Sequence, residues 1–284
     1  MHAPNWELNQ RMIARLQAPS SPYAWQWEHA LVPLALALVY WLCAGPLRRR
    51  IDGTAEFPRA RIQVFMIGVL VLFASVATPL DTLSGYLLTA HMIQHLLMTL
   101  IVPPLLLLGT PDWMLRPLLA LPLARPILRV LTHPVVAFLL FNFVFSAWHV
   151  PALYNLALQN DTVHILEHLL FLGTAVLTWW PVFSPTRELP RLSEPAQLLY
   201  LFFESLPPTI LGALITFAGD PLYPEYVSAP RLWGLSVMLD QQIGGLIMWI
   251  PGALVYFTVL TIVFFRWLNR DEYERSRDTR PVAR

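Results

Sequence analysis

The sequence has no lysine and few charged residues of any kind. All 19 basic side chains among its 284 residues are arginines, and 13% of the residues are charged whereas 56% are hydrophobic. A soluble domain carries about a quarter charged residues, so this chain has too few to cover a surface in water. The composition excludes a soluble globular protein and predicts one whose solvent is the lipid bilayer.

Cysteine is almost as rare, since Cys43 is the only one. One thiol cannot form an intramolecular disulfide, and it excludes redox or metal motifs of the CxxC type. P-loop, GxSxG and nucleic-acid-binding motifs are also absent, so we expect no nucleic-acid partner. Residues 1–24 contain no apolar run of signal-peptide length, and the first membrane segment is therefore expected to serve as the targeting signal.

What the sequence does contain is a series of long apolar stretches. A spanning helix needs about 20 mostly apolar residues, and no internal repeat or long linker divides the series. We expect an all-α transmembrane bundle of seven helices over residues 26–266, between an extracytoplasmic N-terminal segment (1–25) and an arginine-rich cytoplasmic tail (267–284). The predicted spans are 27–47, 62–80, 86–109, 133–156, 162–183, 196–218 and 236–265.

The distribution of arginine predicts how this bundle is oriented. Sixteen arginines fall in the loops after spans 1, 3 and 5 and in the C-terminal tail, whereas Arg11, Arg15 and Arg231 fall on the other side. Short cytoplasmic loops carry the excess of basic residues. The N-terminus is therefore predicted to lie outside and the C-terminus in the cytoplasm.

Five histidines occupy the outer halves of spans 3, 4 and 5. They are His91, His95, His149, His164 and His168. Four of them form two pairs spaced four residues apart, and side chains with this spacing project from one face of a helix. At a rise of 1.5 Å per residue all five would lie within about 15 Å of the outer edge. Burying five polar rings at one depth is costly, so we predict a shared metal site, whereas His29 and His133 near the interfaces are expected to have packing roles.

Other polar or soft residues could be ligands or could orient the imidazoles. They are Glu167, Met98, Asp240, Gln241 and Gln242. Asp240 could hold the second ring nitrogen of a ligand histidine, or it could be an interfacial residue that reaches water. Met98 follows His95 by three residues, but methionine is more typical of a core. Gly244 and Gly245 would let another helix approach closely, and the acidic residues near the outer loops, Asp81, Asp161, Asp220 and Glu225, are expected to be solvated.

Three kinds of site could use these histidines. Imidazole binds copper, zinc, iron and nickel, and the affinity order of divalent ions favours copper. A bis-histidine haem would use His95 and His168 but would leave the other three histidines without a role. An intramembrane zinc hydrolase would use three imidazoles, a water and Glu167 or Asp240 as general base, although HILEH differs from the HExxH motif in the position of its acid.

Several segments resemble the CtaG-type cytochrome c oxidase assembly proteins. They are HMIQHLLM (91–98), PPLLLLGTP (103–111), SAWHVPALYNLAL (146–158), HILEHLLFL (164–172) and DQQIGGLIMWIPG (240–252). The resemblance covers the chain from about span 2 to the end of span 7, in the expected order. It does not extend to the unrelated single-span copper chaperone of the same name, which carries paired cysteines.

The resemblance implies a multi-pass protein of the bacterial inner membrane that is a copper-handling assembly factor and not an enzyme. The partners it implies are the catalytic subunit of a haem–copper oxidase, which receives the copper, and a periplasmic copper donor. The five histidines and the run from Asp240 to Gln242 stand at matching motif positions, which implies a single site. A copper importer is a close variant, in which Met98 and Glu204 would be deeper binding positions.

Overall fold

The computed structural model describes residues 22–48 and 59–278, and within these ranges every element is a helix. The predicted N-terminal segment (1–25) therefore lies largely outside the described residues, as do residues 279–284 of the predicted tail. The helices are η1 (Trp27–Ala30), α2 (Leu31–Ala44), α4 (Arg59–Val76), α5 (Pro79–Ser84), α6 (Leu88–Leu96), η2 (Leu97–Ile101), α7 (Val102–Gly109), α8 (Asp112–Leu119), α9 (Ala124–Leu131), α10 (Pro134–Trp148), α11 (Pro151–Gln159), α12 (Asp161–Phe183), α13 (Glu194–Thr216), α14 (Pro224–Ser228) and α15 (Val237–Asp278).

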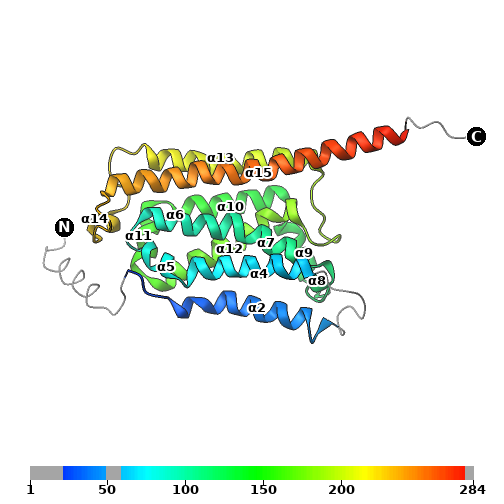
Figure 1. Cartoon of the computed structure of the whole chain (residues 1–284), viewed down its shortest axis with the longest axis horizontal. Helices are drawn as coiled ribbons and strands as arrows, with labels where there is room; N and C mark the ends of the chain where they lie inside the picture. The colour runs from blue at the N-terminus through cyan, green and yellow to red at the C-terminus, as the bar shows by residue number, and fades with distance from the viewer. Residues whose placement is uncertain (1–21, 49–58, 279–284) are drawn as a thin grey trace, which may run out of the picture.

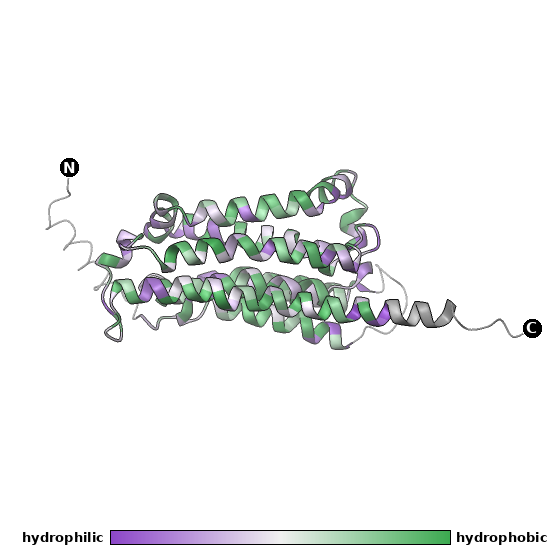
Figure 2. Cartoon of the chain, turned by 90° about the horizontal axis from the view of Figure 1, so that it is seen from above, coloured by the Kyte–Doolittle hydropathy of each residue, from purple (hydrophilic) through white to green (hydrophobic). Residues whose placement is uncertain are grey.

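The long helices run side by side, and short helices lie at the two ends of the bundle (Figure 1). The helices α5, α11 and α14 lie at one end, which we call the α11 end, and α8 and α9 lie at the other, which we call the α8 end. Hydrophilic residues gather mainly toward these two ends, and hydrophobic residues dominate between them (Figure 2). A helix satisfies its own backbone hydrogen bonds, so apolar runs of this length form helices in lipid.

The predicted all-α membrane bundle is confirmed. Six helical runs among the described residues are long and apolar enough to cross a membrane, and the bent pair α9–α10 would make a seventh. Five of the predicted spans agree with these runs to within a few residues. The last helix, α15, is longer than its predicted span, because it continues for 42 residues without a break to Asp278.

The fourth span differs from the predicted single helix over 133–156. The helix α10 ends at Trp148, and a separate helix, α11, begins at Pro151. A proline disfavours the helical conformation in the residue before it, and Val150 is extended, with φ −64° and ψ 128°. The other end of α10 joins α9 at a bend of 72°. His149 therefore lies at the end of a 15-residue helix and not within a continuous span.

The two spans that carry the histidine pairs are the most enclosed in the bundle. Of an 18-residue stretch in Leu88–Gly109, 61% is buried, and the same share is buried in Asp161–Phe183. In the other long runs the buried share is between 17% and 33%. The faces of these two central spans are therefore covered by protein, which is where polar side chains can be kept away from lipid.

The adjacent glycines Gly244 and Gly245 of α15 lie where neighbouring helices approach. A Cβ on Gly245 would lie 2.8 Å from the carbonyl oxygen of Gly212 on α13, and one on Gly244 would lie 2.9 Å from the Leu88 side chain on α6. Contacts this short leave no room for a larger residue without a shift of the helices. The predicted close approach at these glycines is confirmed, and it holds α15 against the helix that carries His91 and His95.

Candidate metal centre

The helix that carries His91 and His95 changes its winding directly after His95. The π-helical segment η2 follows α6 and leads into α7, and such segments often occur at functional sites. Pro103 has no N–H, so the carbonyl of Thr99, four residues earlier, lacks its usual helical donor. Trp179 of α12 donates to that carbonyl, with 2.8 Å between its Nε1 and the Thr99 oxygen. This bond joins the two spans that carry the histidine pairs.

The structure brings the five predicted histidines together. Ring centroids are 4.2 Å apart for His91 and His95 and 4.1 Å apart for His164 and His168. Between the two helices, the centroids of His91 and His164 are 5.5 Å apart and those of His95 and His168 are 5.7 Å apart. His149 reaches the group from the end of α10, with its ring 6.2 Å from that of His95. We call these five residues and Glu167 the histidine cluster.

Hydrogen bonds fix the tautomer of His91. Tyr226 on α14 donates its hydroxyl proton to the carbonyl oxygen of Ser84 at 2.8 Å, because a carbonyl can only accept. The Tyr226 oxygen therefore accepts from His91 Nδ1, 3.0 Å away. Burial raises the pKa of Tyr226 well above 10, which keeps the hydroxyl protonated. A neutral His91 then carries its lone pair on Nε2, the nitrogen that faces His95 Nε2 at 2.8 Å.

His149 is held in the same manner by its own helix. Its Nδ1 donates to the carbonyl oxygen of Phe145 at 2.7 Å, so the lone pair of the neutral ring is on Nε2. That nitrogen is buried without a hydrogen-bond partner, and so are the Nε2 atoms of His164 and His168. Buried polar atoms without partners are rare in native structures, and an imidazole whose Nδ1 is held while Nε2 is free has the arrangement of a metal ligand.

Glu167 adds an unpartnered carboxylate to the histidine cluster. Both of its oxygens are buried without a hydrogen bond, and Oε1 lies 3.7 Å from His95 Nε2. Ligand atoms of Glu167, His91 and His164 all lie within 4.8 Å of one another. Ligands at about 2.0–2.2 Å from one ion are themselves about 3–4 Å apart, so small side-chain movements would let these three share an ion.

Asp81 is a second carboxylate at the cluster, and it was not among the site residues predicted from the sequence. Asp81 was expected to be solvated but is buried on α5, where its ligand atom lies within 4.8 Å of those of His164 and His168. Its two oxygens also bond to His29 at 2.9 Å and Gln94 at 2.5 Å. The segment before it, a threonine followed by a proline, is a typical helix start. That pattern could have placed Asp81 on a helix and not in a loop.

Asp240 lies at the edge of the site and has a different role from that of a metal ligand. Its carboxylate accepts from the backbone N–H groups of Leu88 at 2.9 Å and Thr89 at 3.0 Å. The first N–H groups of a helix have no partner within the helix, and the residue before α6, Leu87, provides no side-chain cap. Asp240 therefore caps α6 from α15, and both of its oxygens contact backbone and not an imidazole.

The remaining three candidates point away from the histidine cluster. Gln241 bonds to the backbone of Leu222 and Asp220 and holds the loop before α14. Gln242 is exposed. Met98 is buried in an apolar cluster with residues of α4. None of these three side chains is placed against the imidazoles.

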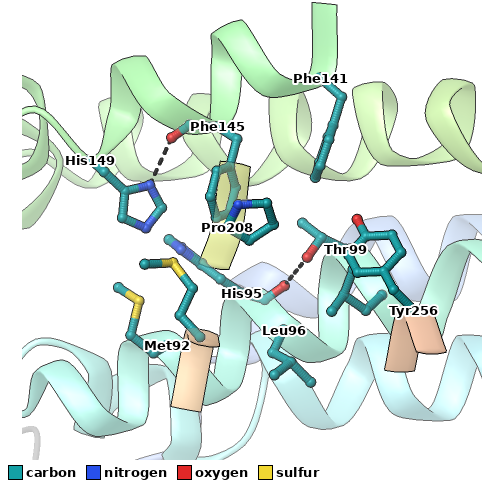
Figure 3. A pocket seen from close by; sticks show the side chains of 11 residues that line it. Met92, His95, Leu96, Thr99, Phe141, Phe145, His149, Pro208 and Tyr256 are labelled. Carbon is teal, nitrogen blue, oxygen red and sulfur yellow. Dashed lines mark hydrogen bonds between the residues drawn. The ribbon is translucent and has the colours of Figure 1, made fainter. Parts of the chain in front are cut away.

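A small cavity adjoins the histidine cluster on the side of His95 and His149 (Figure 3). Besides these two histidines it is lined by Met92 and Met248, and the rest of the lining is mainly aliphatic and aromatic. Neither the cavity nor Met92 was predicted from the sequence. Met92 precedes His95 by three residues, a spacing that places both on one helix face.

These features define a multi-pass helical membrane protein with a buried polyhistidine centre. The sequence matches the model of the family described as cytochrome c oxidase caa3 assembly factor (Caa3_CtaG) over residues 38–270, and the chain belongs to this family. The family suggests a non-catalytic role in the assembly of an oxidase. The resemblance stated from the sequence motifs is thereby confirmed.

The chain is also similar to longer mycobacterial proteins. It is 24% identical over 274 residues to proteins of Mycobacterium tuberculosis and Mycobacterium bovis, and 24% identical over 277 residues to one of Mycobacterium leprae, all described as uncharacterized. In each case the match covers 90% of this chain and 41% of the relative. No solved structure is significantly similar to the chain.

Proposed function

We propose that the protein binds copper at the histidine cluster and delivers it to the catalytic subunit of a haem–copper oxidase in the bacterial inner membrane. The copper is cargo, supplied by a periplasmic donor. The observation that carries this proposal is the convergence of five imidazoles from three helices, three of which have a buried Nε2 without a hydrogen-bond partner. Membership of an oxidase assembly family supports an oxidase subunit as the recipient of the copper.

The chemistry of the ligands supports copper as the ion. The cluster offers imidazoles and two carboxylates, and imidazole ligands bind copper more tightly than the other divalent ions of the first transition row. His91 and His149 each have Nδ1 held by a hydrogen bond, which leaves the lone pair of the ring on Nε2; in His149 this Nε2 has no hydrogen-bond partner. Delivery needs ligands that can exchange, and a set of five imidazoles offers more ligands than one ion requires.

The spacing of the rings argues against a haem at the same place. A haem with two axial histidines needs a flat space between them that is wide enough for the macrocycle. The centroids of His95 and His168 are 5.7 Å apart, but the rings of His91 and His164 pack directly beside them at 4.2 and 4.1 Å. The cluster is therefore better suited to a single ion.

The second candidate function is a zinc-dependent hydrolase, and Glu167 is the observation that favours it. An unpartnered carboxylate beside two imidazoles could act as the general base for a zinc-bound water. In our proposal the same carboxylate instead neutralises part of the charge of the bound copper. The two functions therefore differ in turnover and in the metal that is retained.

The orientation follows from the arginines, and it makes delivery from the periplasm possible. We infer that the α11 end faces the periplasm, because the arginine-rich loops lie at the α8 end and basic loops stay in the cytoplasm. The histidine pairs lie in the first halves of the spans Leu88–Gly109 and Asp161–Phe183, which begin at the α11 end. A periplasmic donor would then reach the cluster through a thin layer of protein formed by α5, α11 and α14.

The direct test is metal analysis of the purified protein in detergent. We expect the parent to retain copper after removal of excess ion, and His95→Ala and His168→Ala to lose it while remaining folded. His133→Ala is the matched control, because His133 is exposed and lies before α10 away from the cluster. Retention of copper by both cluster variants would refute the proposed site. A Soret band would instead indicate a cytochrome, and stoichiometric zinc with hydrolytic turnover would indicate the enzyme.

A further inference from the structure

We propose that the cavity beside the histidine cluster is a separate subsite for cuprous copper, formed by the thioethers of Met92 and Met248 and the imidazoles of His95 and His149. We call these four residues the methionine subsite. This inference rests on the proposed function and adds to it the oxidation state that the protein stores. The rest of the cluster, with its carboxylates, would hold the divalent ion.

The four side chains come to the cavity from three different helices. Met92 and His95 lie on one face of α6, His149 directly follows the last residue of α10, and Met248 lies on α15. All four are at most 6% exposed. Figure 3 shows the rings of His95 and His149 and the side chain of Met92 turned toward the same space. The contact of Gly244 with Leu88 holds α15, which carries Met248, against α6, which carries Met92 and His95.

Two nitrogens of this subsite are left without partners, and the tautomers show that both carry lone pairs. The neutral His91 has its lone pair on Nε2, so at the 2.8 Å contact the donor must be His95 Nε2–H. The lone pair of His95 is then on Nδ1, which is buried without a hydrogen bond. The Nε2 of His149 also carries a lone pair and has no hydrogen-bond partner, since the Nδ1 of this ring donates to the carbonyl oxygen of Phe145. His95 therefore offers its free nitrogen as Nδ1.

The ligand chemistry selects a soft, singly charged ion. Thioethers favour cuprous copper, whereas divalent ions prefer imidazole, carboxylate or thiolate ligands. All four ligands of the methionine subsite are neutral, and no carboxylate lines the cavity. The cost of burying an ion rises with the square of its charge, so one charge costs about a quarter of what two charges cost in the same surroundings. By contrast, Glu167 and Asp81 lie beside His164 and offset a higher charge.

The experiment compares two methionine substitutions with a matched third. The reduced protein in detergent is titrated with cuprous copper against a chromogenic chelator, and separately with cupric copper. Met92→Leu/Met248→Leu keeps the volume of the side chains and removes both sulfur atoms. Met98→Leu is the control, because Met98 is equally buried near the same helix but packs against α4.

Loss of one outer partner of a metal ligand weakens metal binding about tenfold or more. The double variant loses two direct ligands, so we expect its cuprous affinity to fall by at least that factor. Its cupric affinity should be unchanged, and Met98→Leu should match the parent for both ions. In X-ray absorption spectra of the parent loaded with cuprous copper, sulfur should be among the nearest neighbours of the ion. This spectrum needs no variant, so it tests the subsite even if the double variant does not fold.

The outcomes separate this inference from the proposed function. Parent-like cuprous affinity in the double variant, or the absence of sulfur in the spectrum, would overturn the methionine subsite. The proposed function would survive either result, provided that His95→Ala and His168→Ala still lose copper. An equal loss in Met98→Leu would also overturn the subsite, since the effect would then come from packing.

Discussion

Glu167 and Glu204 are both buried in this bundle, but only Glu204 has hydrogen-bond partners. Glu204 on α13 accepts from the hydroxyl of Thr178 at 2.5 Å with one oxygen and from the amide of Asn142 at 3.1 Å with the other. Glu167 on α12 has no hydrogen bond to either oxygen within the described part of the chain. Each residue is at most 1% exposed, so burial does not distinguish them.

The difference indicates which region is complete without a ligand. A buried polar group costs free energy unless it is hydrogen-bonded, and a buried charge costs more unless it is paired. Glu204 meets this requirement, since each of its oxygens accepts a hydrogen bond from a neighbouring side chain. The region of Glu167 does not, since both oxygens of the carboxylate and three Nε2 atoms of the histidine cluster are unpartnered, and a cation bound between Glu167, His91 and His164 would give the carboxylate and His164 a partner.

The largest expected effect is the stabilisation of the parent by copper. A ligand that binds only the folded state at a thousand times its Kd adds about 4 kcal/mol to the free energy of unfolding. Thermal unfolding in detergent, with and without copper, should show this gain in the parent and its reversal by a chelator. In His91→Ala/His95→Ala the gain should vanish. The same gain in that variant would mean that copper acts elsewhere on the protein.

Removal of Glu204 should have the next largest effect, and it should act on stability alone. Glu204→Ala leaves the donors of Thr178 and Asn142 without their acceptor and opens a cavity, so we expect a loss of about 3 kcal/mol in the free energy of unfolding. Copper bound per folded molecule, measured by elemental analysis, should equal that of the parent. A loss of copper with the fold intact would place Glu204 on a path for the ion and would favour the importer variant.

Much of the fold could be predicted because a membrane span is a local property of the sequence. Twenty apolar residues in a row predict a helix whatever its neighbours are, and six spans followed from this. The fourth did not, since the apolar run continues past Pro151 and hides the end of α10 at Trp148. The bend between α9 and α10 likewise depends on packing that no single stretch of sequence displays.

The sequence predicted the depth of the site residues in the membrane but not the direction in which their side chains point. The rise per residue placed the five histidines at one level, but spacing could not decide the role of Asp240, which faces the backbone of α6. Met98 lies three residues after His95, and in a regular helix it would share its face. The π-helical segment that begins at Leu97 turns through a smaller angle per residue than an α-helix, so Met98 faces α4. Met92 precedes this segment and lies beside His95.

Tyr226 provides a smaller test of how the Glu167 region is prepared for an ion. Tyr226→Phe removes the oxygen that holds His91 Nδ1, and loss of such an outer partner weakens metal binding about 10–100-fold, or about 1.4–2.7 kcal/mol. Competitive copper titration would measure the change. Tyr223→Phe is the control, since Tyr223 is buried nearby but donates to the backbone of His149 and not to a ring. Equal losses in both variants would show a general loosening of α14.

Asp240 should affect the helix more than the ion. Asp240→Ala removes the cap of α6, which typically costs about 1–2 kcal/mol, whereas asparagine can still cap a helix. We therefore expect Asp240→Ala to lower the free energy of unfolding and Asp240→Asn to lower it less, with copper affinity within error of the parent in both. A large loss of copper affinity in a folded Asp240→Asn would make Asp240 part of the metal centre.

The smallest effect on stability, and the sharpest test of the comparison, is expected for Glu167→Gln in the metal-free protein. No hydrogen bond is lost at Glu167, and removal of an unpaired buried charge relieves its desolvation. The free energy of unfolding should therefore rise or stay within about 1 kcal/mol of the parent, well short of the tail of strongly destabilising core substitutions.

Glu204→Gln is the matched control, because an amide there turns a donor toward Thr178 or Asn142 and should cost about 1–3 kcal/mol. With copper present the order should reverse: Glu204→Gln should keep the full gain on binding, and Glu167→Gln should lose part of it. If both variants were equally destabilised without metal, Glu167 would have hydrogen-bond partners of its own, and a cation site would no longer explain its unpartnered oxygens.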